Sequence, residues 1–131
     1  MGAGVAVALG EKLLFATGSA EIGEEQHVAL DTLCPILREM DCRIRVEGNT
    51  DEVPINTEQF PSNWELSVAR AVSVVKYCIS KGFILPERLS AAGYADSRPR
   101  VPAVSERDRA LNRRVEILVI LDRSKGGSRH G

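Results

Sequence analysis

The chain has 131 residues, of which 44% are hydrophobic and 27% are charged, and its formal net charge is −1. This length predicts one domain with a sizeable core, and the near-neutral charge argues against nucleic acid or an anionic lipid surface as the partner. No stretch approaches the roughly 20 apolar residues that cross a bilayer, and the N-terminus lacks the basic start and long apolar run of a signal peptide.

Alternation of apolar residues predicts a first strand from Val5 to Leu9, and the segment 12–22 then reads as a short extended piece. Helical spacing predicts a helix from about Glu24 to Met40, which Pro35 either kinks or splits. A second strand, 43–48, is expected to point its aliphatic side chains inward and its charged side chains toward a solvated face. The inward residues are Ile44 and Val46, and the outward residues are Arg43, Arg45 and Glu47.

A polar loop with two prolines follows at 49–61, and its length favours a functional role. Ser62 and Glu65 match the capping box, so a second helix is predicted from Ser62 to about Lys81. Its buried stripe is expected to hold Trp64, Val68, Ala71, Val72, Val75 and Ile79. Arg70 would then face outward, together with Leu66, Ser73 and Tyr77.

A third strand is predicted at 89–94, a short helical turn at 105–110 and a last strand at 113–121. The Gly- and Ser-rich residues 123–131 are expected to be a disordered tail, which leaves a domain at 4–122. The element order is β-α-β-α-β-(short α)-β. It predicts an α/β two-layer sandwich with two main helices on one face of a four-stranded mixed sheet.

Three cysteines are too few for a disulfide framework, and none lies in a CxxC pair. Buried free thiols are expected, with a Cys34–Cys42 bridge as the alternative in an oxidising compartment. Two histidines cannot build a zinc site, and the adjacent acids Asp51 and Glu52 have no partner placed to complete acid–base catalysis. We therefore expect no enzyme activity, metal or cofactor.

Four motifs, "GNTD", "NWELSVARA", "GYADSRP" and "RALNRRVEI", occur in this order. Together they resemble the OmpA-like peptidoglycan-binding domain over nearly the whole chain, from about Val5 to Leu121. The segments "TDEVPI" and "FPSNWELS" further resemble the MotB branch of that family, the periplasmic anchor of the flagellar stator. The resemblance implies a fold like that of the OmpA C-terminal domain and a role in binding without catalysis.

By position, the resemblance implies that Asp51 and Arg70 clamp the diaminopimelate residue of the peptidoglycan stem peptide. The end of that side chain carries an ammonium and a carboxylate, which an anion and a planar cation recognise. Asn49, Thr50 and Asn63 are further candidate ligand-binding residues, although Asn63 also suits a turn. Asn49 replaces the histidine of the family motif, so this position keeps a hydrogen bond but cannot titrate.

Asn112, Arg113 and Arg114 are expected to support the site. The two arginines alternate across the last strand, so one is expected to support the ligand loop while the other pairs with an acid such as Glu116. Trp64 is expected in the core rather than as a platform for sugar stacking.

The MotB resemblance further implies a periplasmic homodimer and a MotA-like membrane partner, reached through a transmembrane helix absent from these 131 residues. Two alternatives stay open at this stage. One is a peptidoglycan tether of an outer-membrane lipoprotein or porin, and the other is a module that mainly oligomerises. "RPR" and "NRR" could contact phosphates, but the neutral charge and few aromatic residues argue against nucleic acid.

Overall fold

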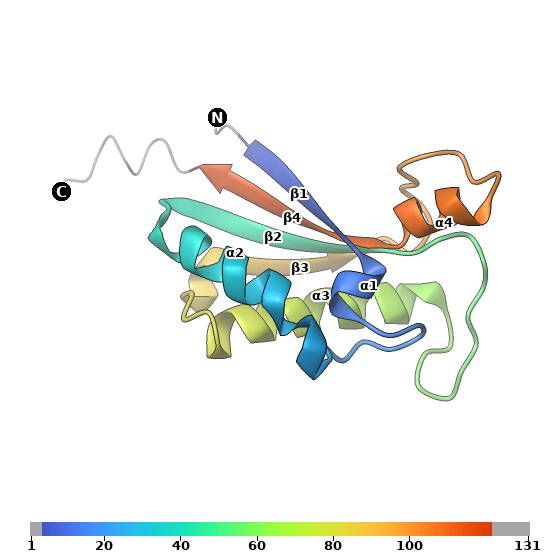
Figure 1. Cartoon of the computed structure of the whole chain (residues 1–131), viewed down its shortest axis with the longest axis horizontal. Coiled ribbons are helices and arrows are strands. Elements are labelled where there is room, and N and C mark those ends of the chain that lie inside the picture. The colour runs from blue at the N-terminus through green and yellow to red at the C-terminus, as the bar shows by residue number, and fades with distance from the viewer. Residues whose placement is uncertain (1–3, 122–131) are drawn as a thin grey trace.

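The computed structural model describes residues 4–121 as a sheet layer and a helix layer (Figure 1). The strands are β1 (Gly4–Gly10), β2 (Cys42–Asn49), β3 (Leu89–Gly93) and β4 (Arg114–Leu121). The helices are α1 (Glu11–Leu14), α2 (His27–Glu39), α3 (Asn63–Ser80) and α4 (Glu106–Asn112). Short 3₁₀ turns occupy Glu24–Gln26 and Pro86–Arg88. The predicted tail at 123–131 lies outside the described residues, so the domain bounds stay a prediction.

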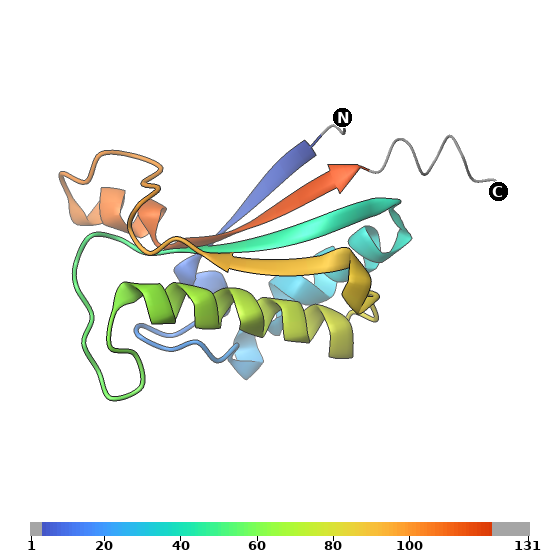
Figure 2. The same ribbon diagram turned by 180° about the vertical axis from the view of Figure 1, so that it is seen from behind.

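The strands form one mixed sheet in the order β1-β4-β2-β3. β4 runs antiparallel to both β1 and β2, whereas β2 and β3 are parallel. A parallel pair needs a long crossover, and α3 supplies it. The two opposite views show α2 and α3 on the same side of the sheet (Figures 1 and 2). This arrangement confirms the predicted α/β sandwich. Within residues 4–121, no helix has both the length and the apolar character needed to cross a membrane.

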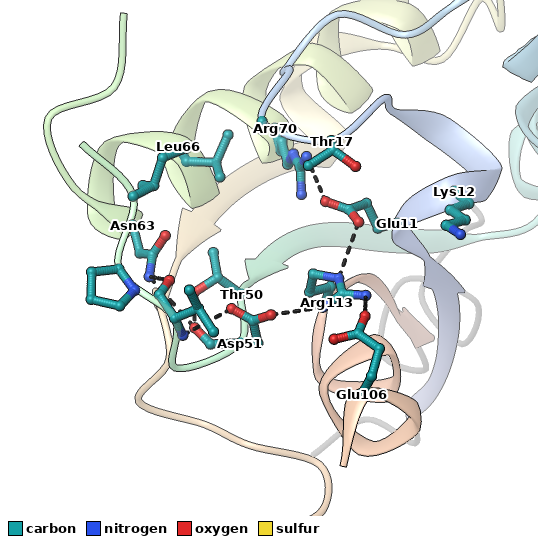
Figure 3. Close-up of a pocket in the computed structure, with 14 residues that line it drawn as sticks. Glu11, Lys12, Thr17, Thr50, Asp51, Asn63, Leu66, Arg70, Glu106 and Arg113 are labelled. Carbon is teal, nitrogen blue, oxygen red and sulfur yellow. Dashed lines mark hydrogen bonds and ion pairs between the residues drawn. The ribbon is translucent and has the colours of Figure 1, made fainter. Parts of the chain in front are cut away.

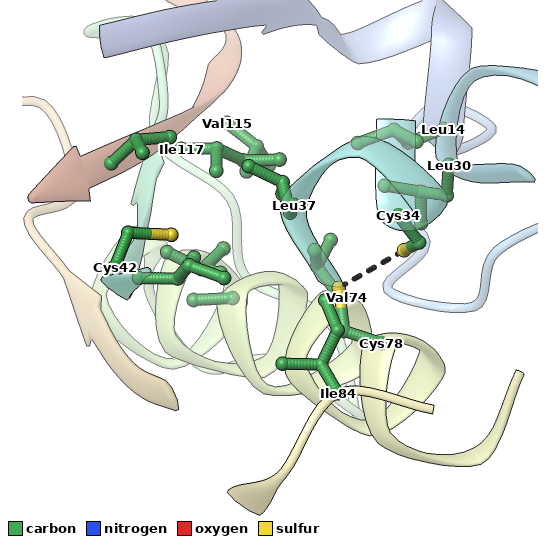
Figure 4. Packing of buried hydrophobic residues seen from close by; sticks show 14 of the residues in the cluster. Leu14, Leu30, Cys34, Leu37, Cys42, Val74, Cys78, Ile84, Val115 and Ile117 are labelled. Carbon is green, nitrogen blue, oxygen red and sulfur yellow. Dashed lines mark hydrogen bonds between the residues drawn. The ribbon is translucent and has the colours of Figure 1, made fainter. Parts of the chain in front are cut away.

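The core lies between the sheet and these two helices (Figure 4). α2 contributes Leu30, Cys34 and Leu37 at helical spacing, and Pro35 lies within a single continuous helix. Ile44, Val46, Val115, Ile117 and Val119 face the helices from β2 and β4. Ile44 and Val46 are the inward positions that alternation predicts for β2.

Ser62 caps α3, as predicted, because its hydroxyl accepts from the Trp64 amide at 3.2 Å and donates to Glu65. The predicted buried stripe of this helix is largely wrong, because Ala71 is its only member that is buried. The buried residues are Leu66, Ser67, Arg70, Ala71, Val74 and Cys78. Trp64 and Val68 are instead 52% and 44% exposed. The buried face is rotated because the segment 11–20 covers the Arg70 side of the helix, a packing partner that helical periodicity alone does not reveal.

Two further expectations need correction. Residues 11–14 form the short helix α1 rather than an extended piece, and extended pairing appears only at the bridge between Phe15 and Ile22. Glu47 was expected on a solvated face but is 5% exposed. Arg45 Nε donates to the Glu47 carboxylate at 2.9 Å, and this ion pair compensates for the burial of the acid.

Two glycines allow α3 to approach the ends of β2 and β3. A Cβ at Gly48 would lie 2.1 Å from the Ser67 carbonyl oxygen, and one at Gly93 would lie 2.5 Å from the Val68 nitrogen. These distances are too short for any side chain, so glycine is required at both positions. The contact fixes the N-terminal half of α3, which carries Asn63, Leu66 and Arg70.

Candidate functional site

A cavity of about 370 Å³ opens at the end of the sheet where β1 ends and β4 begins (Figure 3). Each part of its wall comes from a different region of the sequence. α1 provides Glu11 and Lys12, the end of β2 leads to Thr50 and Asp51, and the following loop contributes Val53, Pro54 and Ile55. α3 provides Asn63, Leu66 and Arg70, and the α4–β4 corner provides Glu106 and Arg113.

Ion pairs connect five charged residues of this cavity into one network, namely Glu11, Asp51, Arg70, Glu106 and Arg113 (Figure 3). Glu11 accepts from Arg70 Nη2 at 2.9 Å and from Arg113 Nε at 3.1 Å. Arg113 also donates from Nη1 to Asp51 Oδ2 at 2.7 Å and from Nη2 to Glu106 at 2.6 Å. Arg113 therefore links three acids, and Glu11 links the two arginines.

Arg70 is buried rather than exposed, and only 3% of the residue is accessible. Besides the pair with Glu11, it donates from Nε to the Ser19 carbonyl at 2.8 Å and from Nη2 to the Ala16 carbonyl at 3.2 Å. Its guanidinium carbon also lies 4.9 Å from the centre of the Phe15 ring, a cation–π contact. The expectation that Arg70 faces outward is therefore wrong, since its side chain fastens the segment 11–20 to α3.

The network sets the electrostatics of the site. Burial lowers the pKa of Arg70, and the neighbouring Glu11 opposes this shift. Burial also disfavours the charge of Arg113, but its hydrogen bonds to Glu106 and Asp51 outweigh burial and raise its pKa. The hydrogen bond from Arg113 lowers the pKa of Glu106. All three groups are charged at neutral pH.

Asp51 and Arg70 both line the cavity, but the direct ion-pair partner of Asp51 is Arg113. Its Oδ1 accepts from the Val53 amide at 3.0 Å, which fixes the carboxylate at the start of the loop. Thr50 donates to the Asp51 carbonyl at 2.8 Å. Asn63 reaches back from α3 and donates to the Val53 carbonyl at 3.1 Å. Thr50 and Asn63 therefore line the cavity and also hold its loop in place.

Three other predicted residues do not line this cavity. The Asn49 side chain is buried beside β4, and its Oδ1 has no hydrogen-bond partner among residues 4–121. Asn112 holds the loop before α4, since its Oδ1 accepts from the amides of Arg100 and Val101 at 2.7 and 3.0 Å. Arg114 pairs with Glu116 at 2.6 Å. The sequence left open which of the two arginines pairs with Glu116, and the structure gives that pair to Arg114, whereas Arg113 lines the cavity.

Glu11 is the central residue that sequence reasoning missed. It follows β1, whose last residue, Gly10, lies opposite Arg114 in the antiparallel pairing with β4. If the first and last strands had been predicted to pair antiparallel, this acid at the end of β1 would have been expected beside the arginines that begin β4. Trp64 is a second miss, because it was expected in the core and is exposed.

Residues 14–113 match the model of the OmpA family. The uncharacterised protein YtxE of Bacillus subtilis is 40% identical over 88% of this chain, and motility protein B of the same organism is 31% identical over 89%. This chain spans about half of these two relatives, 48% and 45% of their lengths.

Solved structures of related domains also align with nearly the whole chain. The cell wall anchor of the type VI secretion system of Pseudomonas aeruginosa aligns with a TM-score of 0.86 at 34% identity, covering 91% of this chain and 82% of that one. The periplasmic domain of Helicobacter pylori MotB aligns with a TM-score of 0.82 at 30% identity, covering 95% and 83%.

Fold and family together define a non-catalytic binding domain built around a sandwich of the OmpA C-terminal type. The chain belongs to the OmpA family of peptidoglycan-binding domains, and MotB periplasmic domains are close neighbours in sequence and structure. The predicted family and the absence of catalysis are thus confirmed.

Proposed function

We propose that this domain anchors a membrane complex of the flagellar stator type to the cell wall by binding the diaminopimelate residue of the stem peptide in the cavity. The balance of charge along the cavity wall is the observation that carries the ligand assignment. Glu11, Asp51 and Glu106 oppose Lys12, Arg70 and Arg113. A wall with equal numbers of acids and bases suits a ligand that carries both charges on neighbouring groups.

Asp51 is the proposed contact for the ligand ammonium, and Arg70 for its carboxylate. Asp51 uses one oxygen for the Val53 amide and the other for Arg113, and each oxygen retains a lone pair. Within residues 4–121, Nη1 of Arg70 donates no hydrogen bond, whereas Nε and Nη2 are engaged. Leu66 and Ile55 offer apolar contact to the methylene groups that separate the two ends of diaminopimelate.

Asp51→Asn tests this assignment because it removes the anion while keeping the shape of the side chain. Arg113 retains Glu11 and Glu106 as partners, so the fold should persist. We expect at least tenfold weaker binding of diaminopimelate or a stem peptide by titration calorimetry, since a charge-assisted hydrogen bond is worth about 1.5–3 kcal/mol.

Glu52→Gln is the matched control for this measurement. It removes an acid at the next position, and that acid pairs with Arg109 at 2.7 Å outside the cavity. Its affinity for the ligand should equal that of wild type. If Asp51→Asn binds as tightly as Glu52→Gln, Asp51 does not contact the ligand.

The stator assignment is supported by the MotB relatives and by the long loop between β2 and α3. It implies a homodimer, a MotA-like membrane partner and a membrane-spanning segment elsewhere in the full protein. The similarity to a secretion-system anchor supports a second candidate, a wall anchor for a different envelope complex. A lipoprotein or porin tether is also compatible with the family.

Deleting the gene in its native host separates these roles. A stator anchor should leave flagella assembled but unable to turn, and crosslinking should recover a MotA-like protein with the full-length chain. Normal swimming by the deletion strain would favour the secretion anchor or the tether. Sedimentation of the domain tests the homodimer, because a strict monomer at high concentration counts against it.

A further inference from the structure

Two cysteines from different helices meet in the core. Cys34 of α2 and Cys78 of α3 bring their sulfur atoms to 3.5 Å, and each residue is 1% exposed (Figure 4). They are separated by 44 positions in the sequence. No spacing motif connects them, so only the packing of α2 against α3 brings the thiols together.

Contacts on both sides of the thiols hold the two helices in this position. On one side, the Tyr77 hydroxyl donates to the Asp31 carboxylate. On the other, Arg38 Nη1 donates to the Gly82 carbonyl at 3.2 Å. A Cβ at Gly82 would lie 2.7 Å from Cys34 Cβ and 2.8 Å from its sulfur, so the absence of a side chain there leaves room for the Cys34 thiol.

The third cysteine has a different environment. Cys42 begins β2, and its sulfur lies 3.3 Å from Arg88 Nη2. The same guanidinium also donates to the Met40 and Leu37 carbonyls. The bridge between Cys34 and Cys42 that the sequence left open is therefore not the pairing that the packing favours.

We propose that Cys34 and Cys78 are a disulfide-forming pair that crosslinks α2 to α3 when the protein meets a disulfide oxidant. The sulfurs already lie 3.5 Å apart, so they need to approach by roughly a further 1.5 Å to reach the S–S bond length of about 2.05 Å. The bond would form inside the core without separating the two helices. OmpA-like domains of this kind occur in the periplasm, where disulfides persist.

The reaction is thiol–disulfide exchange with oxidised glutathione as the probe. The hydrogen bond with Cys78 lowers the pKa of Cys34, whereas that bond and burial raise the pKa of Cys78. The Cys34 thiolate attacks one glutathione sulfur and releases a first glutathione. Cys78 then loses its proton, attacks the Cys34 sulfur of the mixed disulfide and releases the second. Two electrons and two protons pass from the protein to glutathione.

Burial controls when this exchange can occur. Since both thiols are buried, oxidant reaches them during folding or when α2 opens locally. The crosslink would close a long loop, so it should stabilise the fold by restricting the unfolded chain. It should also slow further local opening of α2. This proposal is independent of the ligand assignment.

The test compares the whole chain refolded in oxidised glutathione with the same chain kept in dithiothreitol. Free thiols are alkylated in denaturant and counted by mass spectrometry, and the linked peptides are mapped. We expect one alkylated thiol, Cys42, after oxidation and three after reduction. The melting temperature of the oxidised form should be roughly 5–15 °C higher than that of the reduced form.

Cys42→Ala should retain the crosslink and show no free thiol after oxidation. Cys34→Ser should show two free thiols under the same conditions. Three free thiols in oxidised wild type, or a mapped bridge from either partner to Cys42, would overturn the proposal. An oxidised form that melts below the reduced one would also overturn it, because the bridge would then be incompatible with the native packing. The wild-type measurements decide the question even if a variant fails to fold.

Discussion

Arg70 supports the fold and faces the proposed ligand at the same time. A guanidinium has five donors, and this one uses Nε and Nη2 for Glu11 and two carbonyls, while Nη1 donates to no acceptor among residues 4–121. Each internal contact also orients the group, so less rotational freedom is lost when a ligand binds. Lysine has neither the planar fork nor enough directed donors to serve both purposes.

Arg70→Ala should therefore destabilise the protein as well as abolish binding. Removing one partner of a buried ion pair typically costs about 3–5 kcal/mol, and the lower end applies because Glu11 keeps Arg113. We expect a fall in melting temperature of roughly 10 °C by circular dichroism. Arg107→Ala, at an exposed position of α4, is the control and should change little. An Arg70→Ala protein as stable as this control would mean that the network adds no stability.

Sequence reasoning brought Asp51 and Arg70 to one site but misjudged how Arg70 is held. The motif match implied the pair, and both residues do line the cavity. The error came from placing the buried stripe of the helix by periodicity alone, which turned Arg70 outward. Its partner, Glu11, is 59 positions away and precedes a segment without clear periodicity. Local patterns cannot reveal such a contact, and the antiparallel register of β1 and β4 explains only why Glu11 lies near the arginines that begin β4.

At the scale of elements, the approach of α3 to the sheet determines the geometry of the site. α3 carries Asn63, Leu66 and Arg70, and Gly48 and Gly93 let its backbone pack directly on the strand ends. The sequence predicted these elements well because their alternation and capping signals are local. It failed for α1, whose four residues are too few to show a period, and for the buried face of α3.

Gly48→Ala should separate α3 from β2. The new methyl group would lie 2.1 Å from the Ser67 carbonyl oxygen, and a backbone atom cannot rotate away as a side chain can. We expect a loss of about 2–3 kcal/mol in the free energy of unfolding, measured by urea denaturation. Ligand binding should also weaken, because Arg70 and Asn63 move with the helix.

Gly10→Ala provides the control for this helix displacement. Among the described residues, and apart from its two chain neighbours, no atom lies within 4 Å of a Cβ at Gly10, although this residue also flanks the cavity-lining Glu11. Its free energy of unfolding and its ligand affinity should both stay close to wild type. Similar losses in the two variants would show that flexibility of the backbone, rather than the close approach of α3, explains the effect of Gly48→Ala.

At the scale of the whole molecule, the cavity should distinguish between chemical types of cell wall. Some peptidoglycans carry lysine in place of diaminopimelate, and lysine retains the terminal ammonium but lacks the second carboxylate. The Asp51 contact would then remain, and the Arg70 contact would be lost. If the cavity needs both charges of its ligand, its acids and bases should therefore bind lysine-type peptidoglycan poorly.

We expect the domain to co-sediment with diaminopimelate-type sacculi and to bind lysine-type sacculi about 10–100-fold more weakly, the factor that one charge-assisted hydrogen bond supplies. The amount bound is measured over a range of protein concentrations. A dimer that engages two stem peptides would raise the apparent affinity for both types of sacculi without changing the ratio of the two affinities.

Asp51→Asn should lose binding to both types, since both present the ammonium. The supernatant should contain no more soluble muropeptide than a boiled-protein control, as the non-catalytic family requires. Equal binding to the two walls would show that the second carboxylate is not recognised, and the role of Arg70 would then be limited to holding the segment 11–20 against α3.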